Sequence, residues 1–237
     1  MIDQKCWICG EPATTGEHLI KKTDLAEVFG KPRPEKPLFL HNAAKTNHRI
    51  QGLGADALKL RSRLCAKCNN QRSQPYDRAW ELFSRFVRNR FPKVFPGAFI
   101  RADRIYTLNS NAELRNAQLY FVKLFGCMIH ENKIPIDLGP FSEALLEGKF
   151  HRDVFIKLGC FPREDRAVGV AGLETAVDNR TGKVICAQWF YDLNDFAVNV
   201  IYAVDHDFWD DTNGAWHPKH GTGRLLVHDF SDNLRTN

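Results

Sequence analysis

Two cysteine pairs with the same short spacing constrain the fold of this chain more than any other feature. Cys6 and Cys9 form one Cys-x-x-Cys pair, and Cys65 and Cys68 form the other. Four thiolates complete a tetrahedral zinc shell, and the two-residue gap lets both sulfurs of a pair face one ion. A redox role is the alternative, but redox dithiols accompany a βαβ pattern, and two pairs in one region favour joint ligation. The spacing predicts a structural zinc ion that joins two distant parts of the chain.

Hard donors and a histidine accompany the cysteines. Glu17-His18 lies between the two pairs, and Asn69-Asn70 directly follows Cys68. Carboxylate and amide oxygens suit Mg²⁺ or Mn²⁺, and a histidine can take a proton from an attacking water. Alone, a Glu-His step is common in a solvated strand, and an Asn pair is a common helix cap. Their position beside the cysteines favours a hydrolytic site built from Glu17, His18 and either Asn69 or Asn70.

These motifs resemble the zinc-stapled branch of the HNH endonucleases, over roughly the first 90 residues. The matching residues are Cys6-x-x-Cys9, Glu17-His18 with Leu19-Ile20 and Lys21-Lys22, and Leu64-Cys65-x-x-Cys68-Asn69-Asn70. The resemblance implies a ββα-metal (His-Me finger) domain in which a β-hairpin and a helix surround one catalytic divalent ion. It also implies that His18 is the general base and that Glu17 and Asn69 bind the catalytic ion, with Asn70 as a substitute ligand.

Two positions depart from the family pattern. The family often has an Asn shortly before the second Cys pair, where this chain has Leu60-Arg61-Ser62-Arg63. Asn42, Asn47 or a backbone carbonyl could then orient His18. Four residues after Asn69, where relatives carry another ligand, this chain has Ser73, with Asp77 one turn later as a replacement.

The charge is unevenly distributed along the chain. Residues 1–100 contain 18 Lys and Arg against 9 Asp and Glu, whereas residues 101–237 contain 15 against 19. A basic field around a phosphodiesterase site suits a polynucleotide substrate. The alternating pattern of 58–64 predicts a strand with a basic stripe of Lys59, Arg61 and Arg63, which could instead be a solvated face. Together with Arg72, these residues are the predicted DNA contacts.

The periodicity predicts an α+β protein with two domains, residues 1–92 and 98–237, separated by the proline-containing segment 93–97. The expected helices are 23–29, 75–90, 112–130 and 141–149, and the expected strands are 18–20, 58–64, 154–158, 167–177, 184–191 and 197–204. The last strands form an antiparallel β-meander with a hairpin at 178–182. The tail from Asp205 through His217, His220 and His228 is expected to be solvated loop rather than a second metal site.

These features together predict a metal-dependent endonuclease that hydrolyses DNA by a one-metal mechanism, with His18 as the base. A zinc-stabilised nucleic-acid-binding protein without catalytic activity is the alternative, and RNA remains possible as the substrate. The 237-residue chain has no apolar signal region or membrane-length run, and its seven cysteines suit a reducing cytoplasm. The C-terminal domain is expected to select targets, form a homodimer or bind a partner protein.

Overall fold

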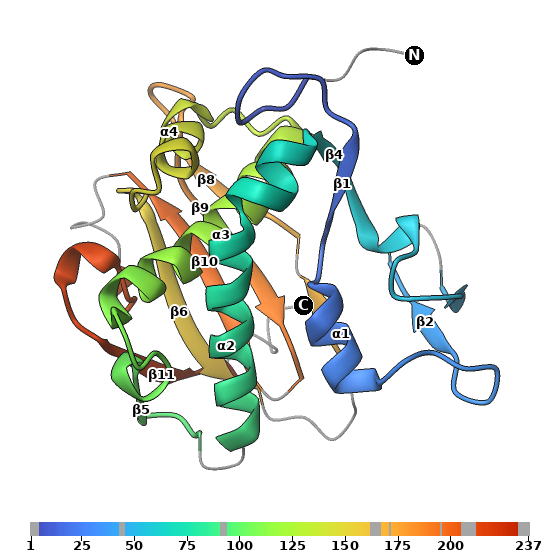
Figure 1. The fold of residues 1–237 in the computed structure, drawn as a ribbon. Coiled ribbons are helices and arrows are strands. Elements are labelled where there is room, and N and C mark those ends of the chain that lie inside the picture. The colour runs from blue at the N-terminus through green and yellow to red at the C-terminus, as the bar shows by residue number, and fades with distance from the viewer. Residues whose placement is uncertain are drawn as a thin grey trace.

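The structure is an α+β fold in which two long helices cross one face of a large sheet (Figure 1). The computed structural model describes residues 5–42, 46–90, 94–161, 167–170, 172–194, 196–204 and 212–231. The predicted α+β class with antiparallel strand pairing is confirmed. The N-terminal half adds two small sheets beside this body, one of two strands from distant segments and one a short hairpin.

The large sheet has the strand order β5-β11-β6-β10-β9-β7, and β8 also pairs with β9. Its strands are β5 (Phe99–Arg101), β6 (Val154–Cys160), β7 (Gly169–Val170), β8 (Glu174–Val177), β9 (Val184–Asp192), β10 (Ala197–Ala203) and β11 (Arg224–Asp229). Strands β8, β9 and β10 pair antiparallel in chain order, which confirms the predicted meander. Gly182, with φ 68°, closes the β8–β9 turn in a conformation that glycine adopts without strain.

Two predictions for the C-terminal half are wrong. Residues 167–177 do not form one strand, because β7 and β8 pair separately with different parts of β9, and glycines at 169 and 172 weaken a continuous strand. The tail is not only solvated loop, because β11 runs parallel to β6 and buries Leu225 and Val227. His217 in the same tail is completely buried. Asp205, His206 and Asp207 lie outside the described residues.

Four α-helices were predicted close to their observed positions. They are α1 (Lys22–Phe29), α2 (Gln74–Arg90), α3 (Ser110–Asn132) and α4 (Gly139–Glu147). Helix α3 is buried on nearly all sides from Ala117 to Ile129, as its apolar sequence predicted. On α2 the buried stripe includes Tyr76 and Trp80, whereas Leu82, predicted in the apolar face, is 39% exposed. Across the described residues, none of the helices has the length and apolar character that a membrane span needs.

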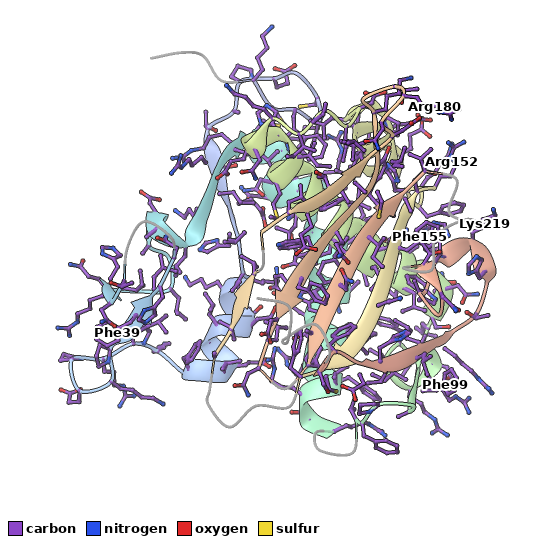
Figure 2. All side chains as sticks on the ribbon, turned by 180° about the vertical axis from the view of Figure 1, so that it is seen from behind. Phe39, Phe99, Arg152, Phe155, Arg180 and Lys219 are labelled. Atoms are coloured by element: carbon purple, nitrogen blue, oxygen red, sulfur yellow. The ribbon has the colours of Figure 1, made fainter. Side chains whose placement is uncertain are left out.

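The N-terminal half contains two antiparallel strands that precede α2 in the chain. Strand β1 (Thr15–His18) pairs with β4 (Lys59–Leu64), and β1 ends at the residue where the sequence predicted it to begin. Between them, β2 (Leu38–Leu40) and β3 (His48–Ile50) form a hairpin that projects away from the body, with Phe39 far from the sheet strand that carries Phe155 (Figures 1 and 2). Short helical turns follow at η1 (Asp56–Leu58), η2 (Lys67–Arg72), η3 (Ala102–Arg104) and η6 (Pro218–His220).

The two halves share one hydrophobic core. A single cluster of buried side chains includes Cys6 and Leu64 from the N-terminal half, Trp80 on α2, Phe125 on α3 and Val200 on β10. Packing between α2 and α3 carries this cluster across the predicted boundary at 93–97, of which residue 93 lies outside the described residues. This shared core does not mark a boundary between the halves, so the division into two domains stays a prediction. The cleft described below also depends on residues from both halves.

A buried carboxylate fixes α1 against α2 and the sheet. Asp24, 2% exposed, accepts hydrogen bonds from Trp80 Nε1 at 2.9 Å and from Tyr191 OH at 3.0 Å, and it pairs with Arg88 at 2.7 Å. Ser84 Oγ donates to the same carboxylate. Burial raises the pKa of Asp24, whereas these donors favour its charged form. The carboxylate is therefore a buried junction of three elements.

Removing this carboxylate should destabilise the fold strongly. We expect Asp24→Ala to lower the free energy of unfolding by about 3–5 kcal/mol, because it removes the buried acceptor of Trp80 Nε1 and Arg88 Nη2. Glu27→Ala is the matched control, since Glu27 pairs with Arg85 and Arg88 near the surface and should cost no more than about 1 kcal/mol. Urea unfolding of both variants measures the difference. Equal losses would contradict a special role for Asp24.

His151 should make stability depend on acid pH. Its ring is buried against Phe141, its Nδ1 accepts the Asp153 amide hydrogen at 3.1 Å, and burial, with smaller effects of His217 and Arg152, lowers its pKa to about 4. The unfolded ring takes up a proton near pH 6.5, so stability should fall by about 3 kcal/mol as the pH drops from 6.5 through 4. We expect His151→Asn to remove this part of the slope in urea unfolding. An unchanged slope would show that other groups cause it.

Candidate metal and catalytic site

The four predicted cysteines converge on one point. The sulfur atoms of Cys6, Cys9, Cys65 and Cys68 all lie within 4.8 Å of one another, and the Cys9 and Cys65 sulfurs are 3.5 Å apart. In a tetrahedral zinc site with bonds of about 2.3 Å, sulfurs are separated by about 3.8 Å, so the four thiols fit such an ion. They can hold a structural metal such as zinc, which joins the segment before β1 to the segment after β4.

Local structure shapes each cysteine pair and anchors it to the body. The Gly10 amide donates to Cys6 O at 2.8 Å, and the Cys68 amide donates to Cys65 Sγ at 3.3 Å. Trp7, inside the first pair, packs on Gly126 of α3, where an added Cβ would meet the indole at 2.3 Å. Its Nε1 also donates to Cys127 Sγ at 3.4 Å. The cysteine cluster is thus fixed against α3.

Arg72 was predicted to contact nucleic acid, and its side chain reaches the cysteine cluster. Its Nη1 lies 3.0 Å from Cys68 Sγ. A guanidinium in this position balances part of the negative charge that four thiolates carry around a divalent ion. A contact between Arg72 and a nucleic acid stays a prediction.

An irregular pairing of β1 with β4 determines where Glu17 and His18 lie. Gly16 pairs with Arg63 but His18 pairs with Lys59, so three residues of β4 lie opposite Glu17 alone. The amides of Arg61 and Ser62 in this bulge donate to Glu131 Oε2 on α3, at 2.6 and 3.2 Å. Such bulges reorient side chains at strand edges. The bulge depends on a partner from the C-terminal half, which sequence patterns did not indicate.

Six of the eight predicted site residues outside the cysteine cluster line one open cleft of about 550 Å³. The lining includes the predicted catalytic and metal-binding residues Glu17, His18, Asn69 and Asn70, and the predicted DNA contacts Lys59 and Arg63. Both basic side chains lie over Gly16, within 3.4 Å of where its Cβ would be. Arg61 lies apart from them, in a hollow beside the C-terminal end of α3. The basic stripe is therefore interrupted at the bulge.

His18 is held by a backbone carbonyl, one of the three alternatives that the sequence left open. Its Nε2 lies 3.1 Å from Leu53 O, at the end of the projecting insertion. Because a carbonyl oxygen only accepts, Nε2 carries the proton and the neutral ring keeps a free lone pair on Nδ1. Burial lowers the pKa of His18, and Lys59, Lys22 and Lys21 lower it further. This environment favours the neutral ring that a general base needs.

Asn69 presents a buried oxygen without a hydrogen-bond donor. The Thr15 hydroxyl donates to Leu64 O at 2.8 Å, so its oxygen accepts from Asn69 Nδ2 at 3.1 Å. These contacts orient the amide, and Asn69 Oδ1 has no hydrogen-bond partner among the described residues. A buried acceptor of this kind is costly unless something binds it. Glu17 lines the same cleft, and carboxylate and amide oxygens are the kind of donor that hard divalent cations prefer.

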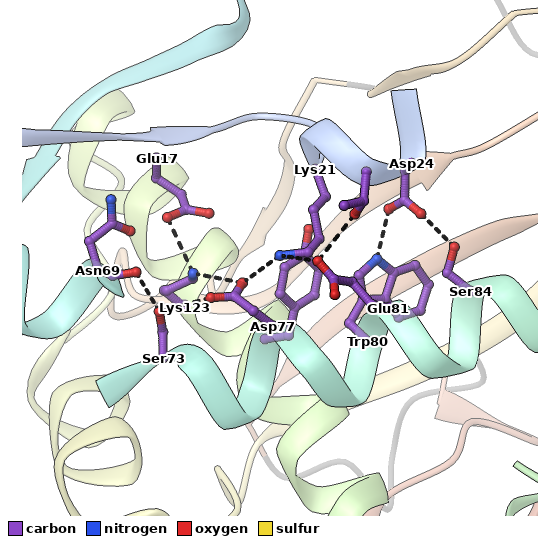
Figure 3. A network of polar contacts seen from close by, with 12 residues as sticks. Glu17, Lys21, Asp24, Asn69, Ser73, Asp77, Trp80, Glu81, Ser84 and Lys123 are labelled. Carbon is purple, nitrogen blue, oxygen red and sulfur yellow. Dashed lines mark hydrogen bonds and ion pairs between the residues drawn. The ribbon is translucent and has the colours of Figure 1, made fainter. Parts of the chain in front are cut away.

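A buried lysine that the sequence analysis missed connects Glu17 to a chain of charges (Figure 3). Lys123 Nζ, on α3, lies 3.2 Å from Glu17 Oε2 and 3.2 Å from Asp77 Oδ1. Lys21 Nζ pairs with Asp77 at 3.1 Å and with Glu81 at 3.4 Å. Burial opposes the charge on Lys123, but Glu17 and Asp77 raise its pKa to about 12. The available signal was Lys123, the one charged residue in the apolar run 119–129 of α3, because a buried charge requires a partner.

The substitutes suggested for the missing family ligands have other roles here. Ser73 Oγ lies 2.6 Å from Asn69 O and 3.0 Å from Asp77 Oδ2, and its single hydrogen is shared between these two acceptors. Asp77 Oδ1 accepts from both Lys21 and Lys123. Burial favours the neutral form of Asp77, but the two lysines and Ser73 together lower its pKa. Both Asp77 oxygens are thus bound within the protein, and Asp77 acts as a counter-ion to the two lysines.

No known protein family, curated protein or solved structure matches this chain. Its chemistry must therefore be inferred from the cleft and the cysteine cluster.

The cysteine cluster should bind one metal ion that the fold needs. We expect the purified chain to contain one zinc per molecule, and Cys65→Ser to lose it and to unfold the N-terminal half, because structural zinc in small metallodomains contributes on the order of 10 kcal/mol. Cys186→Ser is the matched control, since Cys186 is buried outside the cluster. Elemental analysis and circular dichroism measure both effects. Full zinc content in the Cys65 variant would contradict this assignment.

Proposed function

We propose that this chain is a metal-dependent endonuclease of the HNH type that hydrolyses DNA phosphodiester bonds. The observation that carries the proposal is the buried Oδ1 without a hydrogen-bond partner on Asn69, a residue that lines the same cleft as Glu17 and His18. The antiparallel pair of β1 with β4, followed by α2, supports a ββα-metal arrangement in which α1, β2 and β3 are inserted between the two strands. The adjacent four-cysteine cluster supports the zinc-stapled branch.

Each of the proposed catalytic residues has a role that its environment supports. His18 accepts a proton from the attacking water through Nδ1, while Leu53 O holds the other side of the ring. Glu17 and Asn69 would hold the catalytic Mg²⁺ or Mn²⁺, and the exposed Asn70, which also lines the cleft, would be the substitute ligand. When bound, the ion supplies Lewis-acid stabilisation of charge on the phosphate and on the leaving 3′ oxygen.

The basic side chains of the cleft support a polyanionic substrate. Lys22, Lys59 and Arg63 line the cleft, and Lys59 is also paired with Asp56 at 2.8 Å. In our proposal these side chains contact the DNA backbone, together with Arg61 and Arg72 on the flanks. The zinc ion has no catalytic role and holds the ends of β1 and β4. Target selection or dimerisation remains the proposed role of residues 98–237.

A non-catalytic nucleic-acid-binding protein is the second candidate. The observation that favours it is the ion pair between Glu17 and Lys123, because a carboxylate paired with an ammonium group is a weaker metal ligand. Such a protein would use the same basic residues and the same zinc cluster without cleavage. RNA is the alternative substrate for either candidate, since phosphate contacts do not distinguish the two polymers.

Cleavage of supercoiled plasmid tests the nuclease proposal. Zinc-replete protein should nick plasmid only when Mg²⁺ or Mn²⁺ is added, and His18→Ala should lower the rate by about 10²–10⁴-fold because it removes the general base. The variant should unfold at nearly the wild-type temperature. His220→Ala is the matched control, because His220 is exposed on η6 and lines no part of the cleft.

The same assay on single-stranded DNA and RNA separates the candidates. Cleavage of RNA alone would replace DNA as the substrate. Salt-sensitive binding without cleavage of any of the three polymers would favour the binding protein. Undiminished nicking by the His18 variant would remove His18 as the base.

A further inference from the structure

The Lys123 ammonium is an internal cation at the proposed catalytic site. The side chain is 1% exposed on the buried helix α3, and its Nζ bridges Glu17 and Asp77 at 3.2 Å each (Figure 3). It also lies 5.7 Å from the centre of the Tyr120 ring, whose face favours a cation. Lys123 therefore occupies, in the free protein, the side of Glu17 that faces the protein interior.

The charges around the cleft disfavour a lone divalent cation. Five cationic side chains line the cleft or contact its carboxylates, namely Lys21, Lys22, Lys59, Arg63 and Lys123. Three acidic side chains do so, namely Glu17, Asp77 and Glu81. The affinity of oxygen sites for divalent ions follows the number of charged ligands, and Glu17 is the one carboxylate that the proposed donor set contains. Neutral Asn69 adds an oxygen but no charge.

We propose that Lys123 neutralises Glu17 in the free protein, so that the divalent ion binds strongly only together with a substrate phosphate, which supplies the missing negative charge. This inference rests on the proposed nuclease function and concerns the order in which its site is filled. The chemical class of the ligand is an ion and phosphodiester pair. Lys123 is then a positioning residue that makes metal binding depend on the substrate.

The network around Asp77 makes such an exchange possible. When Glu17 turns toward an incoming ion, Lys123 keeps Asp77 as its partner, so no buried charge is left alone. Asp77 in turn keeps the Lys21 ammonium at 3.1 Å and the Ser73 hydroxyl at 3.0 Å. Lys123 can therefore lose its ion pair with Glu17, the proposed metal ligand, and still have the Asp77 carboxylate as a partner.

Binding of Mn²⁺ to zinc-replete protein tests the inference without relying on cleavage. Electron paramagnetic resonance of free Mn²⁺ would measure its affinity for the His18→Ala variant, with and without a short DNA duplex, after subtraction of the Mn²⁺ that the duplex binds alone. We expect the duplex to tighten Mn²⁺ binding at least about tenfold, and we expect Lys123→Gln to tighten it by a similar factor without duplex. Lys123→Arg keeps the charge and should bind Mn²⁺ as weakly as the parent.

Lys219→Gln is the matched control, because it removes one exposed lysine on η6, outside the cleft, and it should change Mn²⁺ affinity less than about twofold with or without duplex. Circular dichroism checks that each variant folds. If Lys123→Gln does not fold, the comparison with and without duplex decides the question by itself.

Three results would overturn the inference: equally tight Mn²⁺ binding with and without duplex, unchanged binding in folded Lys123→Gln, or cleavage in chelator that depends on Lys123. The last result would mean that the ammonium replaces the ion. Failure to cleave any nucleic acid, with the expected Mn²⁺ pattern intact, would instead contradict only the proposed nuclease function.

Discussion

The buried Asp24 carboxylate is the contact on which the relative position of the two halves depends. It lies on α1 and binds Trp80 and Arg88 of α2 and Tyr191 of β9. The Tyr191 hydroxyl also accepts the amide hydrogen of Lys21 at 2.8 Å, directly before α1 begins. Since Lys21 and Asp77 belong to the charge network of the cleft, the position of α1 also fixes the residues that surround Glu17. Asp24 thus stabilises both the packing of the core and the positions of the residues around Glu17.

The cleft lies where the two halves meet, and contacts from both halves hold its side chains in place, whereas the sequence analysis placed the site in the N-terminal half alone. Glu17 and His18 come from the N-terminal half, but the cation that contacts Glu17 and the carboxylate that binds the β4 bulge come from α3. The cysteine cluster also packs on α3 through Trp7. Residues 98–237 therefore contribute to the site itself, in addition to any role in target selection or association that we propose for them.

Patterns that act locally were readable from the sequence. The two-residue gaps between cysteines, the alternation of 59–64 and the apolar surface of α3 each follow from geometry within one element, and the structure has all three. Contacts between distant segments were not readable. The ion pair of Glu17 with Lys123 and the carbonyl of Leu53 beside His18 depend on tertiary packing, and a backbone carbonyl has no residue signature. Strand β11 was missed because its partner β6 is remote and its apolar run is short.

The packing of Trp7 on Gly126 has a consequence for how the chain matures. Trp7, inside the first cysteine pair, and Cys127 on α3 are 120 positions apart. The ribosome therefore synthesises the first cysteine pair long before the surface of α3 on which Trp7 packs. All four thiols of the cysteine cluster are synthesised before α3, so they can meet one another, and a metal ion, before the surface on which Trp7 packs exists. The cluster reaches its packed position only after α3 has formed.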